Sequence, residues 1–140
     1  GLCLDKDYPY TAEQDSCQNT TCTKKANISN YSLITQNSEF QLERAVLHQP
    51  VSVAIQANKR SFQLYKAGIY SDLDCGFQLD HGVLLIGYGY DKDLDMKYWI
   101  IKNSWGSSWG ENGYIRIQKN IDDDRGLCGI AMQPSIPLLR

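Results

Sequence analysis

Two side chains that could carry out chemistry, a histidine and an asparagine, each lie at the end of an apolar run. His81 begins residues 81–89, which are rich in aliphatic residues and have the length of a strand. Asn103 follows a second apolar run, residues 99–101, and precedes a segment rich in glycine and tryptophan. If the two runs are neighbouring strands, His81 and Asn103 meet at one end of a sheet.

A His–Asn pair of this kind is suited to proton transfer. Imidazole exchanges a proton near neutral pH, provided that its ring is held in one orientation and one tautomer. The Asn103 side-chain oxygen could accept one ring N–H of His81, so that the other ring nitrogen takes the proton of a thiol. Trp105 would cover this hydrogen bond. For His81 alone, the alternative of a half-buried strand histidine beside a turn stays open.

Both segments resemble the papain-like cysteine proteases, which include the cathepsins. Residues 79–89 read Leu-Asp-His-Gly-Val-Leu-Leu-Ile-Gly-Tyr-Gly, which is similar to the histidine strand of that family. Residues 102–117 read Lys-Asn-Ser-Trp-Gly-Ser-Ser-Trp-Gly-Glu-Asn-Gly-Tyr-Ile-Arg-Ile, which is similar to its asparagine segment. The resemblance implies peptide-bond hydrolysis by a Cys-His-Asn mechanism, with His81 as base and then acid and Asn103 as its orienting group.

The nucleophilic cysteine of that family is missing from this sequence. Family members carry it in a Cys-Gly-Ser/Ala-Cys-Trp/Tyr motif, more than about a hundred residues before the histidine. None of the five cysteines here lies in such a motif. The resemblance therefore implies that this is the C-terminal portion of a larger enzyme, that an upstream segment supplies the cysteine, and that this chain alone is inactive. The alternative is a non-catalytic relative of the same fold, a pseudoprotease or a structural protein, in which the nucleophile is replaced. A lectin-like or inhibitor module is a third class.

The resemblance also implies an α+β fold, with an antiparallel, β-barrel-like right domain, peripheral helices, and a helical left domain mostly absent from this chain. Residues 1–30 are polar and are predicted to be a connector and the end of the left domain. Residues 31–140 are then the β-rich right domain, which carries the catalytic His and Asn.

Local patterns predict two elements of the β-rich part. A capping box of Ser38 and Gln41 predicts a helix that ends at Pro50. Its partly apolar face would hold Phe40, Leu42, Ala45, Val46 and Gln49. Alternation over residues 51–58 predicts a strand with Val51, Val53, Ile55 and Ala57 buried and the intervening residues, including Gln56, on the other face.

Substrate-binding residues follow from the resemblance alone. The positions that match the walls of the main specificity pocket are Ala54, Leu79, Gly82 and Gln133, which predict a preference for Leu, Phe or Val two residues before the scissile bond. Asp80 would tune the histidine or bind substrate through its backbone. Trp109 matches the tryptophan on the leaving side of the substrate. Its glycine-flanked setting, like that of Trp105, predicts an exposed ring, and core packing is the alternative for both residues.

Cysteines and glycosylation motifs indicate an oxidising compartment. By resemblance, Cys75 pairs with Cys128 and Cys17 pairs with the missing segment, which leaves Cys3 and Cys22 as a local pair. Sequence alone does not fix this connectivity. Three Asn-X-Ser/Thr motifs begin at Asn19, Asn27 and Asn30. We therefore expect a protein of the secretory pathway, lysosomal, vacuolar or extracellular.

Composition and charge exclude several classes of partner. The 140 residues are 42% hydrophobic and carry a net charge of −2, and the pI is near 5.6. This balance offers no basic field for nucleic acid, and no apolar run is long enough to span a bilayer. The acidic segment of residues 91–97 lacks the glycine and glutamate of a calcium loop, and zinc-ligand spacing is absent, so no metal or cofactor is expected. The expected partners are polypeptide substrates, the N-terminal portion of the same enzyme, and cystatin-like inhibitors or a propeptide.

Overall fold

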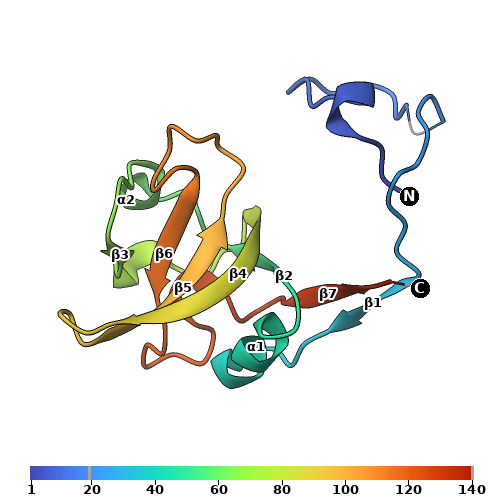
Figure 1. Ribbon diagram of the computed structural model, residues 1–140. Helices are drawn as coiled ribbons and strands as arrows, with labels where there is room; N and C mark the ends of the chain where they lie inside the picture. Colours follow the sequence, from blue (N-terminus) through green and yellow to red (C-terminus); the bar gives the residue numbers. More distant parts are fainter. Residues whose placement is uncertain (19, 140) are drawn as a thin grey trace. The chain divides into compact units, whose positions relative to one another are not determined.

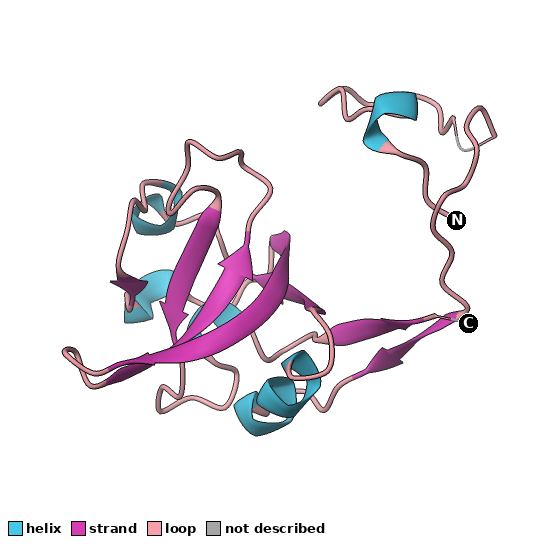
Figure 2. Ribbon diagram, in the orientation of Figure 1, coloured by secondary structure: helices cyan, strands magenta, loops and turns pink. Residues whose placement is uncertain are grey.

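The computed structural model describes residues 1–18 and 20–139 of the chain, which divides into two compact units (Figures 1 and 2). One unit comprises Gly1–Ser32 and Pro137–Arg140, and the other comprises Leu33–Ile136. The α-helices are α1 (Glu39–Val46) and α2 (Arg60–Gln63), and the 3-10 helices are η1 (Asp5–Asp7), η2 (Leu73–Cys75) and η3 (Leu127–Gly129). The strands are β1 (Asn30–Leu33), β2 (Val51–Ile55), β3 (Ile69–Tyr70), β4 (His81–Asp91), β5 (Met96–Lys102), β6 (Tyr114–Gln118) and β7 (Ser135–Leu138).

The smaller unit is held together by a disulfide and backbone hydrogen bonds rather than by a hydrophobic core. No described residue of Gly1–Ser32 is buried. A disulfide joins Cys3 to Cys22, and the Leu2 N–H donates to the Ala26 carbonyl at 2.7 Å. These contacts close the segment into a loop, but they do not test whether residues 1–30 end a helical domain, which stays a prediction.

The larger unit is built on a sheet whose central strands position the candidate site. Among the described residues, seven strands form one sheet in the order β1-β7-β2-β4-β5-β6-β3. β4 pairs antiparallel with β2 and with β5, and β5 pairs antiparallel with β6, whereas β3 joins β6 in parallel. This mixture of one sheet with short helices confirms the predicted α+β class.

Alternating burial anchors the central strands. Val83 and Leu85 of β4 turn into the core, whereas Leu84 and Ile86 turn outward. The core of the larger unit is apolar and closely filled, and its largest fully buried side chains are Trp99, Phe62, Leu42, Ile55, Leu85, Ile101, Ile115, Ile117, Leu127 and Ile130. The ends of β4 and β5 are therefore held on a rigid support.

Helix α1 begins as predicted but presents a different face. The Ser38 hydroxyl accepts a hydrogen bond from the Gln41 N–H at 3.3 Å, which confirms the cap, but the helix ends at Val46, before Pro50. Phe40, predicted on the apolar face, is 66% exposed, so that part of the prediction is wrong.

Contacts of two carboxylates, as well as apolar burial, determine which face of α1 packs against the core. Leu42 and Val46 are buried, and Glu39 and Glu43 lie on the same side of the helix at i and i+4 spacing. Glu39 accepts a 2.6 Å hydrogen bond from the Trp99 indole N–H, and Glu43 forms a 2.7 Å ion pair with the buried Lys119. These contacts orient the helix, and the same geometry turns Phe40 outward.

Strand β2 follows the predicted alternation only as far as Ile55. Gln56, predicted on the face opposite to the buried Val51, Val53 and Ile55, is only 5% exposed, because the chain leaves the strand there and the side chain turns inward.

In the part of the chain that the structure describes, no helix combines the length and apolar character needed to cross a bilayer.

Candidate active site

The antiparallel pairing of β4 with β5 brings His81 and Asn103 together. His81 is the first residue of β4, and Lys102, the last of β5, pairs with Leu84. Asn103 therefore emerges beside the start of β4. The His81 Nε2 atom lies 2.7 Å from the Asn103 Oδ1 atom, within hydrogen-bonding distance.

The neighbouring backbone fixes the tautomer of His81. The Ser104 N–H lies 2.7 Å from the same Asn103 oxygen. A backbone N–H only donates, so the atom it meets is the amide oxygen and not the amide nitrogen. That oxygen accepts, so the His81 Nε2 must carry a proton and donate it. The Nδ1 atom of the neutral ring is then the nitrogen without a proton.

Trp105 covers the pair from one side. Its ring stacks on the His81 ring, with centroids 5.0 Å apart and planes inclined by 28°. Asn103 is only 8% exposed, whereas Trp105 is 38% exposed. The tryptophan therefore stands between solvent and the buried amide, where it limits competition from water.

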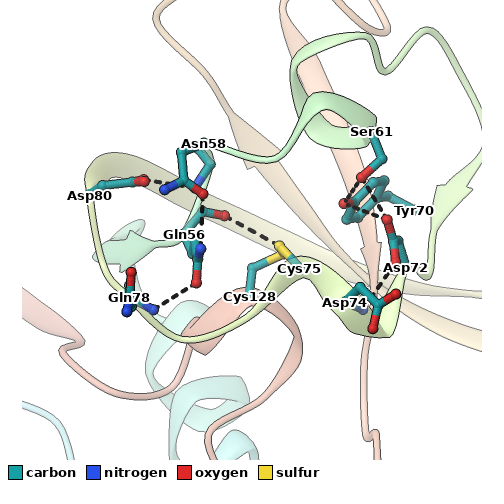
Figure 3. Close-up of a disulfide and its surroundings, with 11 residues drawn as sticks. Gln56, Asn58, Ser61, Tyr70, Asp72, Asp74, Cys75, Gln78, Asp80 and Cys128 are labelled. Carbon is teal, nitrogen blue, oxygen red and sulfur yellow. Dashed lines mark hydrogen bonds between the residues drawn. A yellow bond between two sulfur atoms is a disulfide. The ribbon is translucent and has the colours of Figure 1, made fainter.

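The segment before His81 is tied to the end of β2 (Figure 3). The Asp80 carboxylate accepts the Ala57 N–H at 2.7 Å, and the Asp80 N–H donates to the Ile55 carbonyl at 3.0 Å. The buried Gln56 side chain accepts the Gln78 N–H at 2.7 Å. Asp80 therefore acts on the backbone around His81 in this structure, and these bonds fix where β4 begins.

A disulfide joins Cys75 to Cys128 and lies beside this segment (Figure 3). Both half-cystines are buried, and the Gln56 N–H donates to the Cys128 carbonyl at 2.9 Å. The pair is the one that the family resemblance implies. All five cysteines lie among the described residues. Cys17 is exposed, and it is the one that lies outside a disulfide.

A cluster of aromatic rings packs against Trp105. Phe62 of α2 meets Trp105 edge-on at 5.8 Å and lies 5.6 Å from Trp109. Trp109 also contacts Tyr65 at 5.5 Å and donates its indole N–H to the Gln63 carbonyl at 3.0 Å. Trp109 is only 9% exposed as a result, so the predicted exposed ring is wrong for this residue.

The four predicted wall residues do not all line one hollow. Ala54 and Gly82 are direct partners on β2 and β4, and a Cβ atom placed on Gly82 would meet nothing within 4 Å. Gly82 lines an open hollow of about 390 Å³ together with Asn103, whereas Gln133 lines a different one of about 270 Å³. Leu79 is half-buried and its side chain lies against Gly129.

The three predicted glycosylation sites belong to the smaller unit, and the described residues contain no candidate metal site. Asn27 and Asn30 are exposed, and Asn19 lies outside the described residues. Within residues 1–18 and 20–139, no three His, Cys, Asp or Glu side chains are grouped so that they could hold a metal ion.

A family profile described as papain family cysteine protease matches residues 1–138. The chain belongs to this family. It is 48% identical over 139 residues to a probable cysteine protease RD21B of Arabidopsis thaliana, and 47% identical over 137 residues to the senescence-specific cysteine protease SAG39 of Oryza sativa subsp. indica. The matches cover 99% and 98% of this chain, but the chain spans only 29% and 40% of the length of these curated relatives.

Solved structures of papain-family proteases share the fold. Bromelain from Ananas comosus in complex with the inhibitor E64 is 41% identical with a TM-score of 0.91, and the match covers 100% of this chain and 64% of that one. A recombinant stem bromelain precursor has the same identity and TM-score, and the chain covers 45% of it. The papain-like right-domain fold predicted from the sequence is therefore confirmed.

Three residues that shape this site were given no role in it by the sequence analysis. Gln56 holds the segment before His81, Phe62 supports Trp105, and Glu111 bonds to a distant glycine, Gly68. By alternation Gln56 fits the outward face of a strand, and Phe62 lies in a short apolar segment without a site motif. Glu111 lay in the recognised asparagine segment, but nothing in its spacing indicates the partner.

Proposed function

We propose that residues 1–140 are the histidine- and asparagine-bearing portion of a papain-like cysteine endopeptidase. The observation that carries the proposal is the 2.7 Å contact between His81 and Asn103, with the amide oxygen identified by the Ser104 N–H. It directs the Nδ1 atom of His81 towards proton transfer. The catalytic cysteine comes from a segment upstream of this chain.

In this mechanism the His81 Nδ1 atom takes the proton of the cysteine thiol. The thiolate attacks the scissile carbonyl carbon, and the imidazolium then gives its proton to the leaving amine, which departs as a thioester forms. Nδ1 next takes a proton from a water molecule, whose oxygen attacks the thioester carbonyl carbon. The C–S bond breaks, the cysteine leaves as the thiolate beside the imidazolium, and the peptide acid is released. Throughout these steps the Asn103 Oδ1 atom accepts a hydrogen bond from the His81 Nε2–H and prevents the ring from turning.

A buried donor supports the presence of a further segment at this site. The Asn103 Nδ2 atom is buried and has no hydrogen-bond partner among the described residues. A buried donor without an acceptor costs about 1–3 kcal/mol. An acceptor supplied by the upstream portion would remove that cost and would at the same time hold the cysteine near His81.

The test compares residues 1–140 with the complete polypeptide. We expect the complete protein to hydrolyse a peptidyl fluorogenic substrate in a way that thiol-blocking reagents abolish, and we expect residues 1–140 alone to be inactive. His81→Ala in the complete protein should remove activity, whereas His48→Ala, which changes the exposed histidine after α1, should leave it unchanged. A complete protein without activity or reactivity towards an epoxide inhibitor would be a pseudoprotease instead.

We further propose that Ala54, Leu79, Gly82 and Gln133 select the substrate residue two positions before the scissile bond. The adjacent positions of Ala54 and Gly82 and the open space above Gly82 support a roomy pocket. Gln133→Glu in the complete enzyme should raise the preference for arginine at that residue, because a carboxylate would pair with it. An unchanged substrate profile would remove Gln133 from the pocket.

The remaining partners and the location complete the proposal. The exposed positions of Asn27 and Asn30 are compatible with glycan attachment in the secretory pathway, and Asn19 is a third candidate. The exposed Cys17 is available for a disulfide with the N-terminal portion of the enzyme. Substrates are polypeptides, and a propeptide or a cystatin-like protein would occupy the same cleft as an inhibitor.

A further inference from the structure

The loop of residues 103–114 connects the site to a polar network around Glu111. The sequence pattern did not predict this network. The Asn103 N–H donates to the Gly113 carbonyl at 3.0 Å, so the two ends of the loop are joined. Within it, the Gly113 N–H donates to the Trp109 carbonyl at 2.8 Å. The Gly113 end of the loop is therefore in direct hydrogen-bond contact with the backbone of Asn103.

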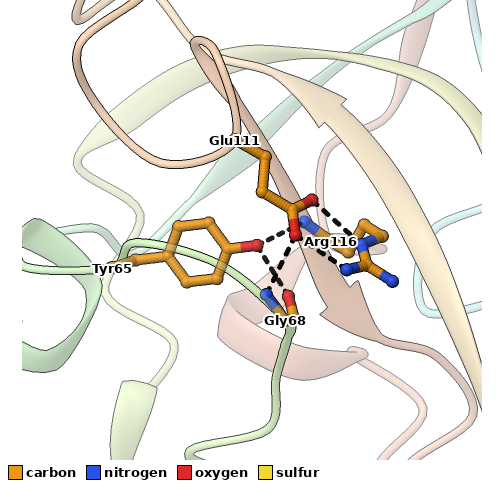
Figure 4. A network of polar contacts seen from close by, with 4 residues as sticks. All are labelled: Tyr65, Gly68, Glu111 and Arg116. Atoms are coloured by element: carbon orange, nitrogen blue, oxygen red, sulfur yellow. Dashed lines mark hydrogen bonds and ion pairs between the residues drawn. The ribbon is translucent and has the colours of Figure 1, made fainter.

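Glu111 fixes that far end of the loop (Figure 4). Its carboxylate accepts two hydrogen bonds from the Arg116 guanidinium, at 2.7 and 2.9 Å, and a third from the Gly68 N–H at 2.9 Å. The Tyr65 hydroxyl donates to the Gly68 carbonyl at 2.6 Å. Hydrogen bonds from Arg116 lower the pKa of Glu111, so the carboxylate is ionised and the two-pronged pair is kept at neutral pH.

A second route runs through the rings. Tyr65 lies 5.5 Å from Trp109, Trp109 meets Trp105 edge-on at 5.2 Å, and Trp105 stacks on His81. The space between Tyr65 and the loop is narrow, because a Cβ atom on Gly110 would lie 3.0 Å from the Tyr65 ring. Glu111 thus reaches the catalytic pair by the backbone and by stacked aromatic side chains.

We propose that Glu111, clamped by Arg116 and Gly68, is a positioning residue for the His81–Asn103 pair. It holds the loop of residues 103–114 so that the Asn103 oxygen stays on the His81 Nε2 proton and the Trp105 ring stays over it. The proposal rests on the proposed function and adds to it a residue that touches neither substrate nor the reacting atoms.

The test uses Glu111→Gln in the complete enzyme, because glutamine keeps an acceptor for Gly68 but loses the ion pair with Arg116. The matched control is Asp123→Asn, which breaks a similar two-pronged pair with Arg125 that includes a 2.7 Å contact and lies outside the loop. We expect Glu111→Gln to lower kcat about tenfold with little change in KM. The basic limb of the pH profile should move to lower pH, because a loosened Asn103 stabilises the imidazolium less. Asp123→Asn should change neither.

A ¹⁵N NMR measurement of the His81 ring, with the cysteine blocked as a methyl disulfide, separates this proposal from the proposed function because it needs no turnover. In the wild type we expect a proton held on Nε2, and in Glu111→Gln we expect that N–H to exchange faster with water and the ring to sample both tautomers. A variant that only unfolds at lower temperature, with the Nε2–H signal and the pH profile of the wild type, would overturn the positioning role. An inactive wild type would overturn the proposed function and leave the Nε2–H signal to decide on the positioning role.

Arg116→Lys provides a second route if Glu111→Gln does not fold. Lysine keeps the positive charge but cannot make the two-pronged contact with the carboxylate. The same changes in kcat and in the exchange of the His81 Nε2–H are expected, at a smaller size. Wild-type values in this folded variant would count against the proposal.

Discussion

The two ends of the β4–β5 hairpin are built from the same two strands but have opposite surroundings. At the turn, Asp91 accepts the backbone N–H groups of Asp93 and Leu94 at 3.0 and 3.1 Å, and Asp93 and Leu94 are exposed. At the open end, His81 and Asn103 are joined to each other, covered by Trp105 and backed by the aromatic cluster. One end closes itself with local bonds, whereas the other depends on residues distant in sequence.

This difference indicates where substitutions should matter. A turn held by local hydrogen bonds tolerates changes at the side chains that make none of these bonds, because the backbone N–H groups keep their acceptor. A pair held by several distant segments loses its geometry when any one of them is removed. The comparison therefore predicts a steep decline in effect from the open end to the turn.

Asn103→Ala in the complete enzyme should have the largest effect. Without the amide oxygen, the His81 ring loses the acceptor that fixes its orientation and tautomer, so kcat/KM should fall about 100-fold or more. Steady-state kinetics with a peptidyl substrate measure this directly. A loss below threefold would mean that the ring is held by Trp105 and backbone alone.

Trp105→Ala should have the next largest effect. Exposure of the hydrogen bond to water should lower kcat/KM about tenfold, while the melting temperature changes little because this ring is already 38% exposed. The matched control is Tyr90→Ala, an exposed aromatic residue at the turn end of β4. Equal losses in the two variants would show that the stacking on His81 has no special role.

Two carboxylates give opposite dependences of stability on pH. Pairing with Arg116 lowers the pKa of Glu111 below its ordinary value of 4.5, so its contribution is present above pH 4.5 and is lost as the pH falls through the lowered value. Glu111→Gln should therefore destabilise the protein by about 1 kcal/mol at pH 7 and by less in acid. Denaturant titrations over a range of pH measure the difference.

Glu39 of α1 is predicted to show the reverse slope. Burial raises its pKa above the ordinary value of 4.5 in spite of its bonds to Trp99 and Asn120. Its charge is therefore a cost at neutral pH that disappears as the pH falls through the raised pKa towards 4.5. Relative to Glu39→Gln, the wild type should gain stability over that interval. A parallel response of Glu39 and Glu111 variants would contradict the assignment of burial and pairing.

Asp93→Asn at the turn should have the smallest effect. The side chain is exposed, and the bond that orders the turn uses its backbone N–H and the Asp91 carboxylate. Activity should be unchanged, and the free energy of unfolding should stay within about 0.5 kcal/mol of the wild type. A larger loss by chemical denaturation would mean that the turn is not self-sufficient.

Local features of the fold could be predicted from the sequence. Alternation indicated β2 and its buried Val51, Val53 and Ile55, and the capping box indicated the start of α1 at Ser38. In these two cases the signal lies within about ten residues, where strand and helix periodicity decide which side chains share a face. The proximity of His81 and Asn103 could be predicted only on the assumption that the apolar run that begins at His81 and the one that precedes Asn103 are neighbouring strands.

Features that depend on distant partners could not be predicted. Phe40 is exposed because Glu39 and Glu43 reach Trp99 and Lys119, which are distant in the sequence. Trp109 is buried because Phe62 and Tyr65 pack against it, although its glycine neighbours resemble an open loop. A residue pattern does not record which remote side chain arrives at a given face.

The most direct test of the account is the protonation of the His81 ring in the complete, thiol-blocked enzyme, measured by ¹⁵N NMR above the pKa of the ring. Because the Ser104 N–H identifies the Asn103 oxygen as an acceptor, we predict that Nε2 carries the proton and Nδ1 is bare. A neutral ring protonated on Nδ1, or one that exchanges freely between the two forms, would contradict the assignment of His81 and Asn103 as a catalytic pair.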